Sequence, residues 1–239
     1  MAYKLNGCET GGLPIHLVKP LVENYDIPFI VETGTAGGLS IREAAKLFKT
    51  CWTIELIAER PDIEEAPTNV HFLVGNSPDV LPSIILKLKI LKDEKESQYV
   101  LFYLDAHYSD EVPNESDCPE CPLLEEINCI AEYGNDAIII IDDARLFFGH
   151  PPYPHNPQEW PSICEIFILL KEKFPYHHIT ITDDYILCIP LHCREVIDKE
   201  WRDRFHIRYP NEKDKLKGQY KEVWKDVKER YSEFLKYVE

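Results

Sequence analysis

The sequence predicts an α/β fold built around a mostly parallel sheet. Short, unbroken apolar segments, each stopped by glycine or an acidic residue, alternate with segments whose apolar residues recur at helical spacing. Strands that are apolar throughout are typical of a parallel sheet covered by helices on both faces. Beyond residue 143 two strands follow each other closely, which predicts an antiparallel hairpin at one edge of the sheet.

The elements can be assigned in chain order. Parallel strands are expected at 28–34, 51–56, 70–75, 98–105 and 136–143. Helices are expected between them at 40–49, 79–92 and 122–134. In the second helix Pro82 is placed near the first turn, where its missing N–H costs little. Gly134 is expected to close the third helix.

The remainder of the chain reads differently. A proline-rich loop over 149–161 precedes a helix over 162–174 and two strands within 177–190, which turn at Asp183 and Asp184. An opening helix at 16–25 and a charged helical tail from about residue 195 are additions that shape a pocket or form a homodimer contact. The tail carries an apolar stripe of aromatic residues: Trp201, Tyr220, Trp224, Tyr231 and Phe234. The chain, 1–239, is expected to be a single domain with its core at about 27–190.

Composition limits the classes of partner. The 239 residues carry a net charge of −16, which disfavours nucleic acid because phosphate binding needs a positive surface. No segment reaches the roughly 18 consecutive apolar residues of a membrane helix, and the N-terminus lacks a secretory signal, so a cytoplasmic protein without a membrane partner is expected. Cys118 and Cys121 have C-x-x-C spacing, which leaves metal or redox use, a disulfide and a reduced loop open.

Polar residues gather where the parallel strands end. Ligands of an open parallel sheet bind beyond the carboxyl ends of its strands. The candidates, in chain order, are Glu32, Gly34, Thr35, Gly38 and Ser40, then Glu55, then Asn76 and Ser77, then Asp105 and His107, and finally Asp142 and Asp143. One such residue would be an ordinary cap, but five strand ends in succession predict a binding site.

The glycine-rich turn 34–38 lets the backbone approach a ligand closely. It matches neither G-x-G-x-x-G nor the P-loop pattern, which weakens a nicotinamide or flavin interpretation and removes a P-loop one. Glu55, about 20 residues further on, suits a ribose diol because an ionised carboxylate accepts from two hydroxyls. The pattern predicts a nucleoside site without a phosphate cradle.

These motifs resemble the class I S-adenosylmethionine-dependent methyltransferases, and among them the divalent-metal-dependent O-methyltransferases of the catechol and sugar/macrolide type. The matching segments are "VETGTAGGLS", "TIEL", "GNSPDVLP", "YLDAH" and "IIDDA", in the same order over about residues 27–145. The resemblance implies a Rossmann-like, doubly wound, mostly parallel seven-stranded sheet, S-adenosylmethionine as cofactor, and methyl transfer to a small-molecule hydroxyl on a sugar, polyketide or phenol.

The resemblance also implies roles for the candidates. Glu32 would face the methionine amino group, Glu55 the ribose, and Asn76 or Ser77 the adenine. The implied cofactor contacts together are Glu32, Gly34, Thr35, Gly38, Ser40, Glu55, Asn76, Ser77 and Asp105. Asp105, Asp142 and Asp143 would be metal ligands, and three carboxylates suit Mg²⁺, with Mn²⁺ or Ca²⁺ as alternatives.

The catalytic assignment rests on Asp105 and His107. In the catechol-type enzymes a lysine stands three positions after the first metal aspartate, where this chain has Tyr108. His107 stands where the sugar-type enzymes have an acidic base, and an imidazole is a competent general base. It could instead pack beside the adenine or orient Asp105. Arg145 would bind an anionic substrate group or neutralise the acidic site, and the loop 149–161 is a lid or an ordinary exposed loop.

Three other functions stay open at this point. One is a Rossmann oxidoreductase that uses a nucleotide cofactor, although its glycine pattern is missing. A second is a methyltransferase-like binding or assembly protein that has lost catalysis. A third is a methyltransferase that acts on protein or nucleic acid.

Overall fold

The computed structural model describes residues 4–5, 8–9, 12–57, 67–94, 99–108, 117–149, 151 and 153–208, with backbone only at 4–5, 8–9 and 205–208. The chain divides into two compact units, 1–196 and 197–239. The helix α6 (Arg194–Arg208) begins in the first unit and continues into the second. Of the predicted aromatic stripe, only Trp201 falls within the described residues, and 48% of its surface is exposed.

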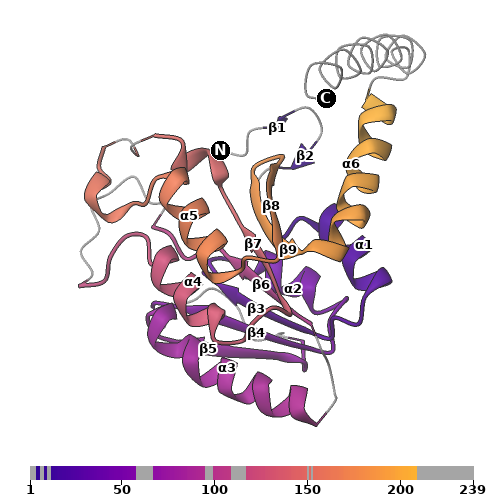
Figure 1. Ribbon diagram of the computed structural model, residues 1–239. Coiled ribbons are helices and arrows are strands. Elements are labelled where there is room, and N and C mark those ends of the chain that lie inside the picture. Colours follow the sequence, from indigo (N-terminus) through magenta and orange to yellow (C-terminus); the bar gives the residue numbers. More distant parts are fainter. Residues whose placement is uncertain are drawn as a thin grey trace, which may run out of the picture. The chain divides into compact units, whose positions relative to one another are not determined.

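The first unit contains a seven-stranded sheet with the order β5-β4-β3-β6-β7-β9-β8 (Figure 1). The strands are β3 (Phe29–Thr33), β4 (Thr50–Glu55), β5 (Val70–Val74), β6 (Val100–Leu104), β7 (Ala137–Ile141), β8 (His177–Thr182) and β9 (Tyr185–Pro190). The first five are parallel, whereas β9 runs antiparallel to both β7 and β8. The predicted parallel sheet with an antiparallel edge hairpin is therefore confirmed. A separate antiparallel pair, β1 (Lys4–Leu5) and β2 (Cys8–Glu9), was not predicted.

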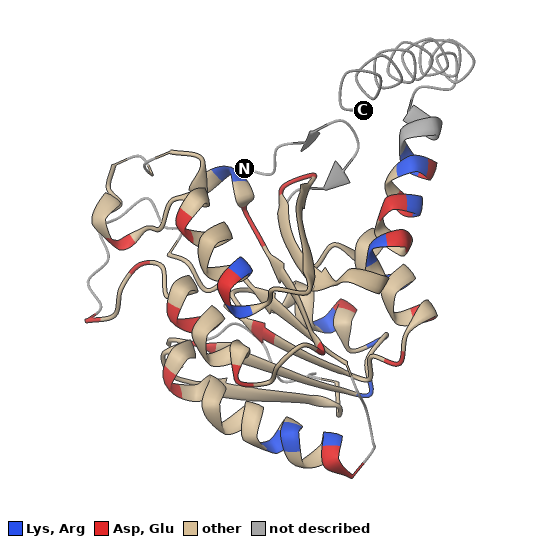
Figure 2. Ribbon diagram, in the orientation of Figure 1, with Lys and Arg blue, Asp and Glu red and all other residues tan. Residues whose placement is uncertain are grey.

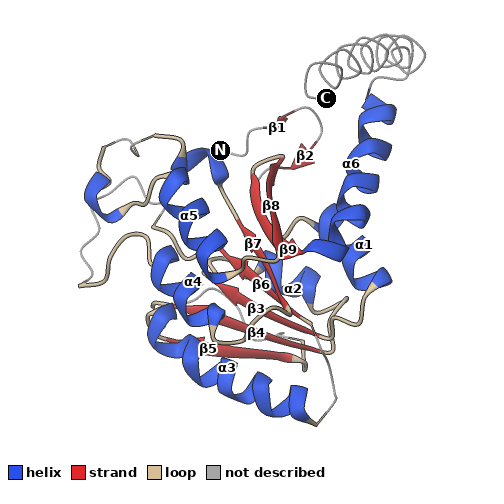
Figure 3. Cartoon of the chain, in the orientation of Figure 1, coloured by secondary structure: helices blue, strands red, loops and turns tan. Residues whose placement is uncertain are grey.

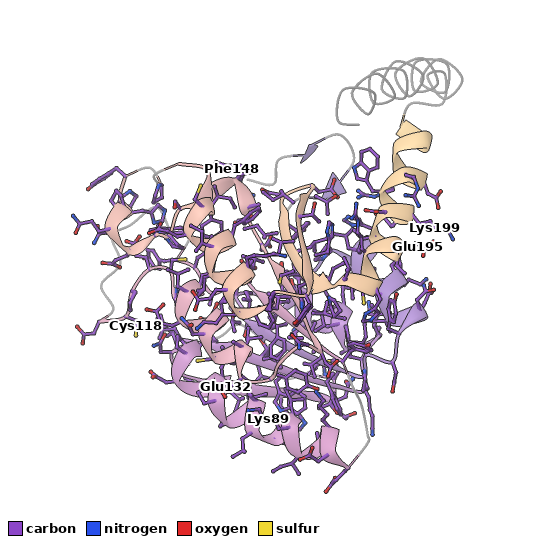
Figure 4. All side chains as sticks on the ribbon, viewed as in Figure 1. Lys89, Cys118, Glu132, Phe148, Glu195 and Lys199 are labelled. Carbon is purple, nitrogen blue, oxygen red and sulfur yellow. The ribbon has the colours of Figure 1, made fainter. Side chains whose placement is uncertain are left out.

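Helices cover both faces of the sheet. They are α1 (Ile15–Asn24), α2 (Leu39–Ala44), α3 (Ser77–Asp93), α4 (Leu123–Ala131) and α5 (Ile163–Lys173), with 3₁₀ turns η1 (Ala144–Phe147), η2 (Pro157–Glu159) and η3 (Leu191–Cys193). Helices α3, α4 and α5 lie on one face, and α1 and α2 lie on the other (Figures 1 and 3). Lys89 of α3 and Glu132 at the end of α4 form an ion pair of 3.6 Å (Figure 4).

The two faces of the central strands differ in chemistry. Val31, Phe102 and Ile139 belong to the apolar core formed with α3, α4 and α5. On the opposite face Glu32 lies in register with Thr53 and with Tyr103, so one buried row of the sheet is polar. Charged residues lie mainly on helices and loops (Figure 2). In the seven strands, whose residues are all described, Glu32 and Glu55 are the only Asp, Glu, Lys or Arg residues.

The helix α3 corrects one prediction. It begins at Ser77 rather than residue 79, so Pro78 occupies the first turn and Pro82 lies inside the helix. Pro82 has no N–H to offer the carbonyl of Pro78 four residues earlier. The thiol of Cys129 on α4 donates to that carbonyl instead, at 3.6 Å. The neighbouring helix thus satisfies the acceptor that the proline leaves open.

The helix α2 is shorter than the predicted 40–49. It ends at Ala44: the N–H of Ala45 still bonds to Ile41 O, but those of Lys46 and Leu47 bond to carbonyls three residues earlier, at 3.2 and 2.9 Å. Such bonds form a tighter turn than the α-helix. Within the described residues no helix is both long and apolar enough to cross a lipid bilayer.

Candidate active site at the carboxyl edge of the sheet

The strand order of the sheet changes direction at β3, which pairs with β4 on one side and with β6 on the other. This is the switch point at which open parallel sheets bind ligands. The hydrogen-bond ladder runs one residue past each strand, from Gly34 N to Ile54 O and from Asp105 N to Thr33 O, both at 2.9 Å. The backbone at each strand end is therefore fixed in place. The residues predicted at this edge lie at the strand ends or in the turns that follow, except Ser40 and Ser77, which lie in the first turns of α2 and α3.

Position 34 requires glycine for a steric reason. Its φ is +80°, and a Cβ there would stand 2.0 Å from the carbonyl oxygen of Asp105. Gly38 has a φ of +71° at the start of α2, with room for a side chain, and nothing lies within 4 Å of a Cβ at Gly37. Glycine is thus needed at position 34 so that the turn after β3 can lie against the end of β6.

Glu55 holds that turn. Its Oε2 accepts hydrogen bonds from the backbone N–H groups of Thr35 and Ala36, each at 3.0 Å, and its Oε1 accepts from Leu56 N at 3.1 Å. Three backbone N–H groups therefore fix the carboxylate of Glu55 in place. The predicted ribose carboxylate lies where the turn meets the end of β4.

A buried polar chain links the turn to the sheet. Glu32 is only 1% exposed, and its Oε2 accepts from the hydroxyl of Thr53 at 2.6 Å. The hydroxyls of Thr53 and Thr35 are hydrogen-bonded to each other in turn. Burying a carboxylate is costly unless it is hydrogen-bonded, and this chain supplies a donor. Glu32 is thereby connected to the glycine-rich turn.

The remaining cofactor candidates make contacts within the chain. Ser40 Oγ accepts from Leu13 N at 3.1 Å, and Asn76 Nδ2 donates to Asp79 at 3.3 Å. Ser77 is 5% exposed, and its hydroxyl donates to Glu126 on α4 at 2.5 Å. The hydroxyl of Ser77 is therefore directed into the protein.

Past the ends of β6 and β7, three ionisable side chains come together. His107 Nδ1 lies 3.7 Å from Asp105 Oδ1, and His107 Nε2 lies 3.1 Å from Asp143 Oδ2. One ligand atom from each of the three lies within 4.8 Å of the other two, the one such group among the described residues. The side chain of His107 is 6% exposed. We call Asp105, His107 and Asp143 the carboxylate–histidine cluster.

Asp142 is not part of this cluster, although the sequence placed it with Asp105 and Asp143. Its Oδ2 accepts from the hydroxyl of Tyr103 at 2.5 Å, and its Oδ1 accepts from Asp143 N at 2.7 Å. Tyr103 is completely buried. Both oxygens of Asp142 therefore already serve donors of the chain.

Arg145 partly neutralises the cluster. Its guanidinium donates to Asp143 Oδ1 at 2.6 Å and to Asp184 at the turn of the β8–β9 hairpin. Its backbone N–H also donates to Asp184, at 3.0 Å. Its side chain is 48% exposed, so a charged group from solution could still reach it.

Several ionisable groups at this end of the sheet have shifted pKa values. Burial raises the pKa of Asp105 to about 8, against the opposing effect of His107. Burial alone would lower the pKa of His107, but the bond to Asp143 and the charge of Asp105 raise it above its ordinary value. Burial and the charge of Asp143 raise the pKa of Asp142. Near neutral pH the carboxyl of Asp105, with a pKa of about 8, therefore retains a proton.

Glu126 was missed by the sequence reasoning. It is 1% exposed, and burial raises its pKa to about 7 although the bond from Ser77 opposes this. Together with His107 it lines a cavity of about 10 Å³, roughly enough for one water. The sequence could have placed Glu126 on the buried face of α4, because Leu123, Ile127 and Ile130 share that face and lie in the core.

The proline-rich loop is fastened beside His107. Glu120 Oε2 accepts from the indole N–H of Trp160 at 2.8 Å and from Asn156 N at 3.1 Å, and it pairs with His155 at 3.3 Å. The ring of Trp160 lies 5.5 Å from that of His107. The loop thus packs against the cluster through Trp160, while Tyr153 is 91% exposed. His150 falls outside the described residues.

The C-x-x-C cysteines are thiols and form no disulfide with each other. Burial raises the pKa of Cys121 to about 12, the opposite of what a reactive thiolate needs. The candidate metal group among the described residues does not include them.

Comparison with protein-family models finds no match. Comparison with curated proteins finds none either. Solved structures similar to this chain include an S-adenosyl-L-methionine methyl transferase from Silicibacter pomeroyi DSS-3, at 8% identity over 73% of this chain and 87% of that one, with a TM-score of 0.38. They also include the N-methyltransferase NodS from Bradyrhizobium japonicum WM9, at 11% identity over 72% and 90%, with a TM-score of 0.39. A third is a SAM-dependent methyltransferase from Anabaena variabilis ATCC 29413, at 9% identity over 79% and 100%, with a TM-score of 0.37.

Proposed function

We propose that this protein is an S-adenosylmethionine-dependent methyltransferase that methylates a hydroxyl group of a small molecule. The observation that carries the proposal is one juxtaposition at the switch point of the sheet. The glycine-rich turn, held by Glu55, contacts the strand end that carries Asp105 and His107. A nucleoside-binding half and an ionisable half therefore meet at Gly34.

The cofactor would lie along the ends of β3, β4 and β5. Glu55 would bind the ribose hydroxyls, Glu32 would lie near the methionine amino group, and Asn76 would lie near the adenine. Glu55 and Glu32 are already fixed by bonds to the turn and to Thr53. A prearranged site of this kind loses less free energy to ordering when its ligand binds.

The acceptor would lie over the carboxylate–histidine cluster. Two carboxylates on adjacent strand ends fit a divalent ion, and Asp105 and Asp143 would hold it, with Arg145 orienting Asp143. Such an ion, when bound, lowers the pKa of a hydroxyl that contacts it.

The remaining chemistry is positioning. The cluster accepts the hydroxyl proton, the oxygen forms a bond to the methyl carbon, and the carbon–sulfur bond breaks to leave S-adenosylhomocysteine. Holding the two reactants in line supplies much of the rate acceleration in such a reaction. The loop at Trp160 would limit water at His107. The net charge of −16 favours a small acceptor over nucleic acid.

Calorimetry on the wild-type protein in EDTA tests the proposal. We expect S-adenosylhomocysteine to bind with a Kd in the micromolar range, about 8 kcal/mol of binding free energy, and NAD⁺ to give no heat. Radiolabelled methyl transfer to a panel of sugars, polyketides and phenols would then identify the acceptor. Failure of both S-adenosylhomocysteine and S-adenosylmethionine to bind would refute the proposal, and binding of NAD⁺ alone would favour an oxidoreductase.

A further inference from the structure

The residue whose ligand atoms come together with those of Asp105 and Asp143 is His107 rather than Asp142. The ligand atoms of Asp105, His107 and Asp143 lie within 4.8 Å of one another. Ligands bound at about 2.1 Å to one ion, at angles near 90° to 110°, are roughly 3.0 to 3.4 Å apart. His107 Nε2 lies 3.1 Å from Asp143, within that range, whereas the 3.7 Å approach to Asp105 is made by the other ring nitrogen, Nδ1. One ion binds only one of these nitrogens, and one ligand atom from each residue lies within 4.8 Å of the other two.

The contacts of Asp142 count against its use as a ligand. Binding an ion through either oxygen would compete with the buried hydroxyl of Tyr103 or with the backbone N–H of Asp143. A buried donor that loses its partner costs roughly 1 to 3 kcal/mol. Asp143 carries no such cost, since Arg145 bonds to Oδ1 and leaves Oδ2 facing His107.

We propose that the metal site of this protein is formed by Asp105, His107 and Asp143, and that it selects Mn²⁺, Fe²⁺ or Zn²⁺ over Mg²⁺. The role of the ion in methyl transfer rests on the proposed function, whereas its binding does not require the cofactor. An imidazole nitrogen is a ligand for zinc and iron, whereas Mg²⁺ prefers oxygen ligands alone. Two carboxylates beside one imidazole therefore favour a first-row transition ion.

The surroundings of the cluster suit ligands rather than a mobile base. His107 is enclosed, with the ring of Trp160 at 5.5 Å and its side chain 6% exposed. Arg145 orients Asp143, as groups outside a metal's own ligands commonly do. With one ring nitrogen on the ion, His107 cannot act as the free base that the resemblance implied, and the hydroxyl proton would pass to the oxygen of Asp105 that does not hold the ion.

The test uses Mn²⁺ on the full chain without cofactor. Titration followed by the electron paramagnetic resonance of free Mn²⁺ gives the affinity, and electron spin-echo modulation of bound Mn²⁺ detects coupling to a ligand ¹⁴N. We expect one bound ion with nitrogen coupling, and a large excess of Mg²⁺ that fails to displace it. Bound Mn²⁺ without nitrogen coupling, or no bound ion, would overturn the proposal.

Three variants locate the ligands. His107→Ala should weaken Mn²⁺ binding by at least about 100-fold and abolish the nitrogen coupling, whereas Asp142→Asn should change affinity by less than about 10-fold and keep it. His16→Ala is the matched control, because His16 also lies 3.1 Å from an aspartate, Asp183, at the hairpin turn. It should bind Mn²⁺ like the wild type. Loss of binding in Asp142→Asn with retention in His107→Ala would contradict the assignment. The wild-type nitrogen coupling decides the matter even if a variant fails to fold.

Discussion

The two halves of the candidate site differ in how their carboxylates are stabilised. On the β3–β4 side, Glu32 and Glu55 each accept hydrogen bonds from neutral donors of the chain. On the β6–β7 side, Asp105 and Asp143 lie beside His107, Asp142 bonds to the backbone of Asp143, and the partly exposed Arg145 is the charged partner of Asp143. The first half is complete in itself, as a cradle for a ligand should be. The second holds excess negative charge, which a cation or a proton must balance.

The junction of the two halves is Gly34, and breaking it should have the largest effect. In Gly34→Ala the new Cβ would overlap the carbonyl of Asp105 at an unfavourable φ of +80°. We expect a loss of about 3 kcal/mol or more in the free energy of unfolding, measured in urea. Gly37→Ala is the matched control: nothing lies within 4 Å of its Cβ. A change of more than about 1 kcal/mol there, or a neutral Gly34→Ala, would contradict the account.

Glu126 should make the free energy of unfolding depend on pH. Its pKa rises from an ordinary 4.5 to about 7 in the folded protein. Because the folded state holds the proton more tightly, the contribution of Glu126 to stability is full below about pH 4.5 and is lost as the pH rises through about 7. Glu126→Gln stays neutral, so it should match the wild type at low pH and exceed its stability at pH 8 by up to about 3 kcal/mol. Equal pH slopes for the two proteins would contradict this.

Tyr103 should matter because it supports Asp142 inside the protein. Tyr103→Phe removes the donor to Asp142 Oδ2 and should cost about 1 to 2 kcal/mol, more at high pH than at low pH because the pKa of Asp142 is raised by burial and only the ionised carboxylate needs the donor. Tyr185→Phe is the comparison, since its hydroxyl bonds to the neutral carbonyl of Gly12. That loss should be no larger and should not vary with pH. Urea unfolding at both pH values measures the difference.

Arg145 should have the smallest effect. Its side chain is 48% exposed, and exposed ion pairs contribute roughly 0 to 1 kcal/mol. Arg145→Gln should therefore change the free energy of unfolding by less than about 1 kcal/mol, with any loss reduced at high salt. A large, salt-independent loss would mean that Arg145 is a structural residue.

The sequence predicted the sheet well because apolar strand segments and their polar ends are local features. The runs ending at Glu55 and Asp105 placed both carboxylates at the correct edge of the sheet. The sequence did not predict contacts between side chains that belong to different helices and strands. That Asp142 bonds to Tyr103, and that Ser77 bonds to Glu126, depends on register and helix packing that no local pattern encodes. Pro82 was misplaced because Pro78 competes for the same position in the first turn.

The most direct test of the two-half account is calorimetry with S-adenosylhomocysteine in EDTA on two variants, Glu55→Gln and Asp143→Asn. Glu55→Gln weakens both the hold on the turn at Thr35 and Ala36 and the proposed ribose contact. We predict that it loses at least about 10-fold in affinity, roughly 1.4 kcal/mol. Asp143→Asn should bind as the wild type does. Loss of binding in Asp143→Asn with retention in Glu55→Gln would contradict the account.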